Sequence, residues 1–231
     1  MVVAPLIEVR GLSFRYEDGT LALNGVDFRL EPGETVALLG PNGSGKTTFL
    51  LHLIGLLRGE GEIIVCGRPV RRENLDFVRR KVGVLFQDAD EQLFMPTVLE
   101  DVAFGPLNQG LPPQEAQRVA LETLAQVGMQ GAAGRAPYHL SAGEKRRVAL
   151  AGVLAMGPEI LVLDEPTTFL DPPSQRHLLD VLRALPQSKL LATHDAAFAR
   201  ALAARAVFFE GGRVVDSGPV DEVARRRHWE V

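Results

Sequence analysis

The sequence has a single cysteine, Cys66, few aromatic residues and no apolar run long enough to span a membrane. One cysteine excludes an intrachain disulfide, which fits a reducing cytoplasm. The most apolar helical stretch, residues 148–156, ends at Gly157-Pro158, far short of the roughly 20 apolar residues that a bilayer span needs. No basic segment followed by an apolar one opens the sequence, so we expect no signal peptide. If the protein works at a membrane, we expect another chain to supply the span.

The sequence also lacks an excess of basic residues. Its 25 Lys and Arg face 29 Asp and Glu, which gives a formal net charge of −4, and the pI is about 5.8. A domain with a broad nucleic-acid footprint usually has a pI above about 9, so we expect no nucleic-acid partner. The 231 residues, 46% of them hydrophobic, suffice for one large α/β domain with or without an inserted subdomain.

Short strands and one predominantly helical stretch divide the chain. The apolar runs 35–39 and 160–163 predict fully buried strands. Residues 98–156 have mostly helical spacing, with Pro113 suited to a first helical position. The pattern predicts an α/β core with a largely helical insert between about residues 88 and 157. Further strands are expected at residues 6–10, 13–16, 23–30, 82–86 and 189–193 and in a hairpin at 206–216, and further helices at residues 47–57, 141–156, 173–185 and from Asp195.

Two smaller features have ordinary structural interpretations. Cys66 follows an apolar run, which predicts a buried thiol at a strand end rather than a reactive one. The basic run at residues 225–227 predicts a solvated helix end.

Residues 40–48, Gly-Pro-Asn-Gly-Ser-Gly-Lys-Thr-Thr, form the most specific motif. They match the G-x-x-x-x-G-K-[ST] pattern of a phosphate-binding loop, in which glycines let the backbone wrap a polyphosphate at a helix N-terminus. We therefore expect ATP here, with Lys46 reaching the β- and γ-phosphates and Thr47 binding Mg²⁺. The expected nucleotide contacts in this loop are Gly40, Pro41, Asn42, Gly43, Ser44, Gly45, Lys46, Thr47 and Thr48.

A pair of carboxylates follows the buried strand 160–163. Asp164 is placed to hold Mg²⁺, directly or through water, and Glu165 to orient or deprotonate the attacking water. An acidic loop without chemistry is the alternative, but a phosphate loop in the same chain favours the catalytic interpretation.

Residues 140–144, Leu-Ser-Ala-Gly-Glu, open a predicted helix. Ser141 and Glu144 fit an S-x-x-E capping box, and such a helix N-terminus can also bind an anion. The segment resembles the signature loop, usually written LSGGQ, of ATP-binding-cassette ATPases. Over essentially the whole chain, the order of motifs is similar to that family: Tyr16, residues 40–48, Gln87, residues 140–144, Asp164-Glu165, Leu170-Asp171 and His194.

The resemblance implies a P-loop NTPase (RecA-like) core with an N-terminal antiparallel β subdomain and an inserted helical signature subdomain, in one cassette domain over residues 1–231. Ser141 and Gly143 would bind the γ-phosphate held by a second protomer. Tyr16 would stack on adenine, unless it is a core aromatic. Gln87 would touch Mg²⁺ or the lytic water, and His194 would contact the γ-phosphate and hold Glu165. The implied catalytic residues are Glu165, His194, Lys46 and Gln87, and the implied metal ligands are Thr47, Gln87 and Asp164.

Three positions depart from the family pattern. Ala142 replaces the first glycine, which is harmless unless the position needs a positive φ. Glu144 replaces glutamine. Phe169 stands where Gly or Ala is usual, near Asp171 at the expected dimer seam, and leaves the geometry of a closed dimer open.

Residues 87–94, 97–106 and 141–147 look like the ATPases of energy-coupling-factor importers, particularly the cobalt type. In that family the acidic segment after Gln87 belongs to the face that meets the coupling helices of a membrane partner, so Asp88, Asp90 and Glu91 would meet basic residues there. A solvated acidic loop followed by an amphipathic helix is the alternative. Such ATPases often carry a C-terminal extension, which we expect to be absent or minimal here.

The sequence therefore predicts a cytoplasmic ATPase subunit, peripheral on the cytoplasmic face of the cell membrane, that dimerises around two ATPs with Mg²⁺. It would power an importer of cobalt, another transition-metal ion or a vitamin without touching the solute. The alternatives are an ATPase of another cassette transporter class, a soluble cassette ATPase acting on DNA or ribosomes, and a phosphate-loop kinase or GTPase. The last has no use for the signature helix, and no guanine-reading Asn-Lys-x-Asp occurs.

Overall fold

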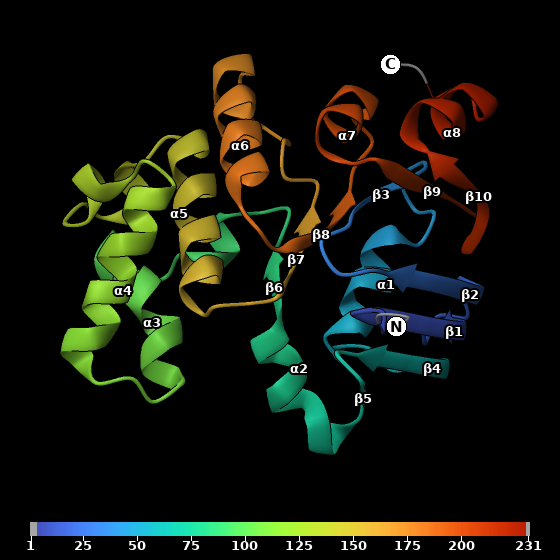
Figure 1. Cartoon of the computed structure of the whole chain (residues 1–231), viewed down its shortest axis with the longest axis horizontal. Coiled ribbons are helices and arrows are strands. Elements are labelled where there is room, and N and C mark those ends of the chain that lie inside the picture. Colours follow the sequence, from blue (N-terminus) through green and yellow to red (C-terminus); the bar gives the residue numbers. More distant parts are fainter. Residues whose placement is uncertain (1–3, 230–231) are drawn as a thin grey trace. The chain divides into compact units, whose positions relative to one another are not determined.

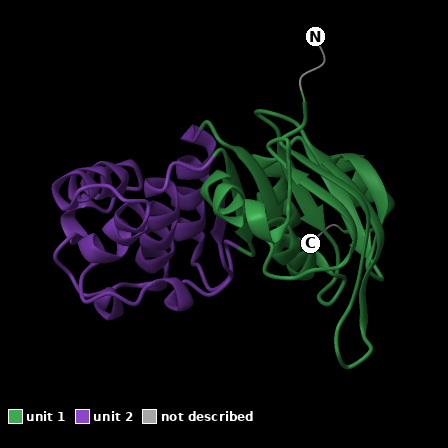
Figure 2. Cartoon of the chain, turned by 90° about the horizontal axis from the view of Figure 1, so that it is seen from below, with its two compact units in different colours: residues 1–82, 159–165, 186–231 green, residues 83–158, 166–185 purple. Residues whose placement is uncertain are grey.

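The computed structural model describes residues 4–229 and divides the chain into two compact units (Figure 2). Unit 1 combines Met1–Val82, Glu159–Glu165 and Pro186–Val231, and unit 2 combines Gly83–Pro158 and Pro166–Leu185. The outermost residues of the predicted 1–231 domain, 1–3 and 230–231, lie outside the described part. The chain therefore leaves unit 1 twice and returns to it twice.

Unit 1 begins with an antiparallel sheet in the strand order β2-β1-β4-β5 (Figure 1). Strand β1 (Ile7–Arg15) pairs with β2 (Leu21–Leu30) and with β4 (Glu60–Val65), and β5 is Arg68–Pro69. Gly11 lies within β1 with a φ of 59°, at a register shift. The two strands predicted at residues 6–10 and 13–16 are therefore one bulged strand, in which a glycine takes the left-handed conformation.

The second sheet runs β10-β9-β3-β8-β7 through unit 1. Strand β3 is parallel to β8 and β9, and β7 is parallel to β8. Parallel neighbours end at the same sheet edge, so the segments after β3, β8 and β7 meet there. The bounds are β3 Thr35–Leu39, β7 Ile160–Asp164, β8 Ser188–Ala192, β9 Arg205–Glu210 and β10 Arg213–Pro219.

Within its described residues, unit 1 also contains five helical elements. The predicted helix 47–57 is shorter, because α1 (Lys46–Leu53) is closed at Gly55, whose φ is 66°. The basic run at 225–227 is the solvated end of α8, as predicted, with Arg225 and Arg226 exposed, and Arg226 and Arg227 also donate to Asp216. The other helices are η1 Arg72–Asn74, α2 Leu75–Lys81, α7 Ala196–Leu202 and α8 Val220–Arg226.

Unit 2 is mostly helical. Strand β6 (Val82–Leu85) carries the chain into it, and Pro113 begins α4, as the sequence predicts. The helix predicted over 141–156 is α5 (Ala142–Ala155), capped by Ser141. The remaining helices are η2 Asp90–Gln92, α3 Val98–Asn108, α4 Pro113–Gln126, η3 Gln130–Ala132, η4 Pro137–His139 and α6 Pro172–Ala184.

The core of unit 1 contains the strands that precede the predicted site residues. Every residue of β7 and β8 is buried, and so are residues 36–39 of β3. Continuous burial explains the unbroken apolar runs 36–39 in β3 and 160–163 in β7, whereas β8 begins with Ser188 and Lys189 and is apolar only from Leu190. The strand ends are thereby held rigidly, which fixes the positions of the polar residues that follow them.

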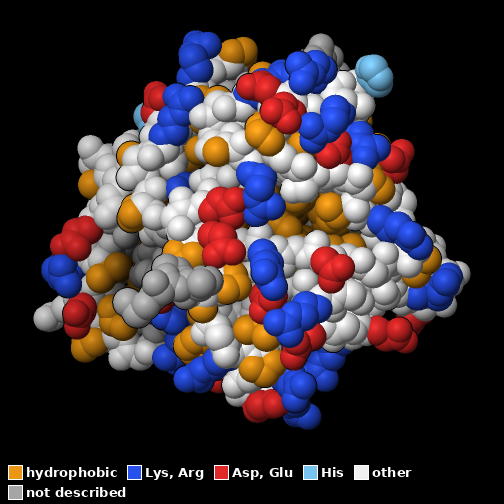
Figure 3. Space-filling model, turned by 45° about the vertical axis from the view of Figure 1, so that its right-hand side comes forward, with side chains coloured by type: hydrophobic (Ala, Val, Ile, Leu, Met, Phe, Trp, Pro, Cys, Tyr) orange, Lys and Arg blue, Asp and Glu red, His pale blue; other side chains and the backbone are white. Residues whose placement is uncertain are grey.

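The surface carries mixed charge, and the described helices are short. Figure 3 shows Lys and Arg side chains interspersed with Asp and Glu over the face that it draws. Among the described residues, no helix has both the length and the apolar content required to traverse a bilayer.

The free thiol of Cys66 is half-buried directly after β4. Burial raises its pKa to about 11, helped by the neighbouring Glu159 carboxylate. The thiolate is therefore scarce at neutral pH, in keeping with the structural role predicted for this cysteine.

Candidate functional site

The loop at residues 40–48 joins β3 to α1 and needs its glycines for two different reasons. Gly40 has a φ of 138°, and a Cβ there would lie 2.2 Å from the carbonyl oxygen of Phe209. Gly45 caps α1 with a φ of 106°, and its Cβ would lie 2.6 Å from the carbonyl oxygen of Ala22. Only glycine combines these backbone angles with such close approach. The loop can thus turn its N–H groups toward an anion at the start of α1.

Lys46 lies inside this loop. Its Nζ donates to the carbonyl oxygens of Gly40 at 2.7 Å and Pro41 at 3.1 Å, and the residue is only 6% exposed. Burial lowers the pKa of Lys46, and the carboxylates of Glu165 and Asp164 counteract that shift. The ammonium is therefore held in the loop, where exchanging carbonyl acceptors for phosphate oxygens needs only a small movement.

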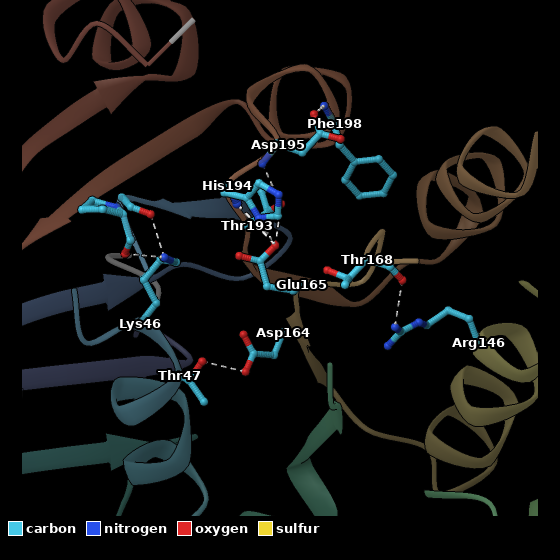
Figure 4. A network of polar contacts seen from close by, with 12 residues as sticks. Lys46, Thr47, Arg146, Asp164, Glu165, Thr168, Thr193, His194, Asp195 and Phe198 are labelled. Atoms are coloured by element: carbon cyan, nitrogen blue, oxygen red, sulfur yellow. Dashed lines mark hydrogen bonds and ion pairs between the residues drawn. The ribbon is translucent and has the colours of Figure 1, made fainter. Parts of the chain in front are cut away.

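Thr47 and Asp164 bring two oxygen ligands together. Thr47 Oγ1 donates to Asp164 Oδ2 at 2.9 Å, and Asp164 is buried at the end of β7 (Figure 4). Hydroxyl and carboxylate oxygens are the ligands that Mg²⁺ prefers, so this pair fits a magnesium ion beside bound phosphates.

Glu165 is the residue whose backbone is most unusual in the candidate site. Its φ is 45°, in the left-handed region that L-residues rarely adopt, and its N–H donates to the carbonyl oxygen of Ala192 at 2.8 Å. Such backbone strain persists where the surrounding structure imposes it, and it clusters at functional sites. The strain turns the side chain of Glu165 toward the segment that follows β8 (Figure 4).

Three donors converge on one carboxylate oxygen of Glu165. His194 Nδ1 lies 2.8 Å from Glu165 Oε2, and the His194 backbone N–H and Thr193 Oγ1 donate to the same oxygen at 3.4 and 3.3 Å. The Glu165 side chain is only 10% exposed, whereas that of His194 is 60% exposed. The structure therefore brings the predicted pair Glu165 and His194 together, with the carboxylate fixed and the imidazole open to solvent.

Tyr16 directly follows β1 and contacts α1. Its hydroxyl lies 3.0 Å from Thr48 Oγ1, the residue is 39% exposed, and its ring packs edge-on against Phe14 at 4.9 Å. Tyr16 is therefore not a buried core aromatic, because it keeps an exposed surface on which a base could stack.

In unit 2, the capping box predicted at the signature segment is confirmed. Ser141 Oγ accepts from the Glu144 N–H at 3.3 Å, and Glu144 Oε2 accepts from the Ser141 N–H at 2.8 Å. Glu144 Oε1 also binds Arg135 at 3.0 Å. These contacts, first the Ser141 N–H, lower the pKa of Glu144. Glu144 therefore both caps the helix and forms an ion pair with Arg135. A glutamine could form the cap but not the ion pair, which explains locally why this chain has glutamate at the position.

Gly143 allows α5 to approach α6 closely. A Cβ at Gly143 would lie 2.5 Å from Ser174 Oγ and 2.9 Å from Ser174 Cβ. Ser174 is itself fixed, because its N–H donates to Asp171 at the start of α6. The glycine of the signature segment thus has a packing role within unit 2 in addition to any role in binding.

We expect Gly143→Ala to destabilise the protein by about 1–3 kcal/mol through overpacking. Ser174→Gly in the same chain should recover part of that loss, because it removes the atoms that clash. Gly152→Ala is the matched control in α5: its Cβ would meet nothing within 4 Å. Urea unfolding of the three variants and the parent chain measures the effect, and equal destabilisation by Gly143→Ala and Gly152→Ala would show that the contact is unimportant.

Gln87 is held by its backbone. Arg146, on the buried side of α5, donates at 2.6 Å to the carbonyl oxygens of both Phe86 and Gln87. Gln92 closes the same loop by accepting from the Phe86 N–H at 2.9 Å and donating to Val84. Sequence reasoning missed both residues. The available signal was an arginine on the same helical face as the buried residues Gly143 and Leu150.

The two other departures also have a structural description. Ala142 is the first residue of α5 and does not have a positive φ, so alanine costs nothing there. Phe169 has a φ of 64° and an exposure of 84%. A glycine would adopt this backbone conformation more easily, so the local conformation does not explain why a phenylalanine stands there.

The predicted residues therefore form two groups, one in each unit. The phosphate loop, Asp164, Glu165 and His194 meet at one edge of the parallel sheet in unit 1, and Tyr16, directly after β1, contacts Thr48 of that loop. Gln87, Ser141 and Gly143 belong to unit 2. Thr193, which binds Glu165, was missed because a threonine at a strand end is an ordinary residue.

Comparison with known families decides what this arrangement is. The family described as ABC transporter matches residues 23–168, which contain the phosphate loop, the signature segment and both carboxylates. This chain belongs to the ABC transporter family. The chain is thus an ABC transporter ATPase, as the order of its motifs predicts.

Relatives of this ABC transporter ATPase support the narrower resemblance. A Streptomyces avermitilis protein provisionally named as an ABC transporter ATP-binding protein is 53% identical over 96% of this chain and 85% of its own length. The energy-coupling factor transporter ATP-binding protein EcfA of Methanothermobacter thermautotrophicus is 47% identical over 95% of this chain and 73% of its own length. The chain thus resembles the energy-coupling-factor subfamily, as predicted.

Solved structures confirm the fold class. The structure of cbiO1 from Clostridium perfringens, titled as part of the ABC transporter complex cbiONQ, has a TM-score of 0.88 at 34% identity and covers 96% of this ABC transporter ATPase and 92% of that chain. A dimeric ATP-binding cassette in a post-hydrolysis state, bound to ADP and phosphate, has a TM-score of 0.83 at 29% identity, covering 93% and 98%. The α/β core, the antiparallel β sheet and the helical signature unit are those of an ABC ATPase.

Proposed function

We propose that two copies of this ATPase, or one copy and a related chain, close around two ATPs and power a membrane importer. The observation that carries this proposal is the Glu165 carboxylate, buried beside the phosphate loop and held by Thr193 and His194. A fixed carboxylate of this kind serves to position and activate one water rather than to stabilise the fold. Residues 1–231 then work as one cassette domain, with the helical insert at about 88–157.

Within each site, the phosphate loop and the two strand ends have separate roles. Lys46 and the loop N–H groups bind the β- and γ-phosphates, and the exposed ring of Tyr16 stacks on adenine. Thr47 and Asp164 would hold Mg²⁺, with Gln87 contacting it, and the bound ion would supply charge neutralisation at the phosphates. Glu165 orients the attacking water, and His194 holds Glu165 while its exposed ring faces the γ-phosphate. Catalysis is then mostly positioning and charge neutralisation.

The second chain completes the site. Ser141 and Gly143 open a helix whose N-terminus favours an anion, and they lie in unit 2 of the same chain, away from the loop motifs in sequence. We infer that they contact the γ-phosphate bound by the partner chain. The dimeric form of the related cassette supports this arrangement.

A surface of unit 2 after Gln87 suits a membrane partner. Phe94 is 62% exposed and packs edge-on at 5.0 Å against Phe104, which is 39% exposed. Asp88 and Glu91 are exposed beside this aromatic pair in sequence, whereas Asp90 already binds Lys145 at 2.5 Å. We infer that a helix of the partner carrying basic and apolar side chains docks here, with the aromatic pair as the apolar anchor.

We expect Phe94→Ala with Phe104→Ala to weaken binding to the membrane partner by about 30-fold, as loss of an aromatic hot spot does. ATP hydrolysis by the chain alone should be unchanged. Tyr138→Ala is the matched control, since Tyr138 is 76% exposed in the same unit. Co-purification from detergent-solubilised membranes measures the effect, and equal recovery of the partner with both variants would place its docking surface elsewhere.

The subfamily resemblance suggests the class of transported solute. A cobalt ion, another transition-metal ion or a vitamin is the proposed cargo, and the ATPase itself works at the cytoplasmic face without touching it. The second candidate is the ATPase of another cassette transporter class, favoured if the co-purified membrane partner belongs to one. ATP-dependent uptake of radiolabelled cobalt by vesicles holding the complex tests the first. Uptake that does not depend on ATP, or that an inactive Glu165→Gln complex retains, rejects it.

A further inference from the structure

One cavity in unit 1 has no part in the functions described above. Its volume is about 430 Å³, and it lies among the end of α1, strand β4 and the segment leading into α2. The ionisable side chains that line it are Arg58, Arg71, Arg72, Glu62, Glu73 and His52. Apolar side chains such as Leu12, Ile63 and Leu75 form the rest of its wall. A cavity of this size is large enough for a small metabolite.

The cavity has unused positive charge. Among residues 4–229, the side chains of Arg58, Arg71 and Arg72 have neither a hydrogen bond nor an ion pair. Glu62 is neutralised by Arg10 at 3.1 Å, so Glu73 is the remaining lining carboxylate. Three guanidiniums without acceptors in an otherwise acidic chain are suited to an anion, and their planar fork matches a phosphate group.

His52 supplies a separate, buried polar group to the same cavity. The residue is 1% exposed, and its Nδ1 lies 2.7 Å from the carbonyl oxygen of Thr48, so Nδ1 carries the proton. Its Nε2 is then an acceptor, and it has no partner among the described residues. A buried acceptor without a donor is costly, and a hydroxyl of a bound molecule would satisfy it. Burial also lowers the pKa of His52, which keeps the ring neutral.

We propose that this cavity binds a small phosphate ester that carries a hydroxyl group, with Arg58, Arg71 and Arg72 on the phosphate and His52 on the hydroxyl. This site goes beyond the proposed function, because neither ATP nor the membrane partner is assigned to it. The phosphate ester is either a free metabolite or the headgroup of an anionic lipid.

The cavity is connected to the nucleotide site through α1. His52 binds the carbonyl of Thr48, and Thr48 Oγ1 lies 3.0 Å from the hydroxyl of Tyr16. The ring of Phe14 packs edge-on against both His52 at 4.8 Å and Tyr16 at 4.9 Å. A ligand that fixes the His52 ring therefore also fixes the ring expected to stack on adenine. By linkage, the ester and ATP then change each other's affinity by the same factor.

Calorimetric titration of the whole chain with glycerol 3-phosphate tests the site, with the phosphate loop saturated by Mg-ADP so that it cannot bind the probe. We expect saturable binding below about 10 mM, stronger than that of inorganic phosphate, because the hydroxyl adds a contact. Arg71→Gln with Arg72→Gln should weaken binding about tenfold or more. Arg80→Gln is the matched control, since Arg80 is an exposed arginine of α2 that does not line the cavity. Absence of binding, or equal loss in the control, overturns the proposal.

Two further measurements locate the contact and its source. The Nε2 nitrogen resonance of His52 should shift when the probe binds, and an unmoved resonance contradicts the His52 contact without depending on any mutation. The second measurement is co-sedimentation with vesicles that contain phosphatidylglycerol. If the chain co-sediments and Arg71→Gln with Arg72→Gln abolishes this, the ligand is a lipid headgroup. If only the soluble ester binds, the ligand is a free metabolite. Binding of neither rejects the site. Turnover by the unliganded variants should match the parent chain, so this test can fail while the ATPase function stands.

Discussion

Replacing Glu165 by glutamine should lower ATP turnover by about 10²–10⁴-fold, the range that a positioned general base contributes. The amide keeps the size of the side chain and can still accept from Thr193 and His194, which lie 3.3 and 2.8 Å from Glu165 Oε2. It cannot accept a proton from water. ATP affinity should therefore change little, because the contacts to the phosphates come from the loop and α1.

Single-turnover hydrolysis with labelled ATP, together with equilibrium binding of ATP, separates these two effects. Glu60→Gln is the control, because Glu60 is an exposed glutamate at the start of β4. A variant that binds ATP normally and fails to hydrolyse it supports the assigned role. Turnover within a factor of a few of the parent chain would falsify it, and loss of ATP binding would mean that Glu165 organises the loop instead.

Replacing Lys46 by alanine should weaken ATP binding by about 10- to 100-fold, because one charge-assisted contact to the phosphates contributes about 1.5–3 kcal/mol. Hydrolysis should fall with it. The side chain is buried in the loop, and its Nζ donates to Gly40 and Pro41, so the loop also loses the group that closes it. The loss of affinity therefore has two causes, the missing positive charge and a less ordered phosphate loop.

Isothermal titration with a non-hydrolysable ATP analogue measures the affinity. Lys81→Met is the control, since it removes the same charge from a lysine of unit 1 that binds Glu159 on the surface. Thermal unfolding distinguishes a folded variant with an impaired loop from an unfolded one. Unchanged affinity in folded Lys46→Ala would place the phosphates elsewhere.

The core of the fold could be predicted because burial imposes composition. Strands β3 and β7 are buried along nearly their whole length, so residues 36–39 and 160–163 are unbroken apolar runs. The Ser141–Glu144 cap could be predicted for a similar reason, since its two hydrogen bonds depend on residues three positions apart.

Other features depend on contacts between distant segments. The sequence predicts a break between two strands at Gly11. In the structure this glycine lies in a bulge within β1, because pairing with β2 continues on both sides of it. Helix α2 was missed because the side chain of Asn74 before it makes no capping bond, and α1 was predicted too long because Gly55, which closes it, was not recognised as the helix end. The left-handed φ of Glu165 is imposed by its hydrogen bond to Ala192 on the neighbouring strand, which no local pattern reveals.

The site residues were predicted by motif and order, but of their partners only the contact between His194 and Glu165 was expected. The sequence places Glu165 after a strand, but the convergence of Thr193 and His194 on one of its oxygens arises because β8 lies beside β7. Arg146 was likewise overlooked, although it holds the backbone of Gln87 from the buried side of α5. A side chain that binds a backbone carbonyl does not require a particular residue type at the partner position, so such a contact cannot be predicted from the sequence.

The central claim is that one chain holds only half of each ATP site and that a second chain supplies the signature residues. The most direct measurement is the mass in solution of Glu165→Gln and of Glu165→Gln with Ser141→Arg, each saturated with Mg-ATP. The account predicts that the first forms a dimer with two bound ATPs, and that the second binds ATP equally well but stays a monomer, because the arginine blocks the partner's γ-phosphate. A monomeric first variant at saturating ATP, or a dimer that forms regardless of the Ser141 substitution, would contradict it.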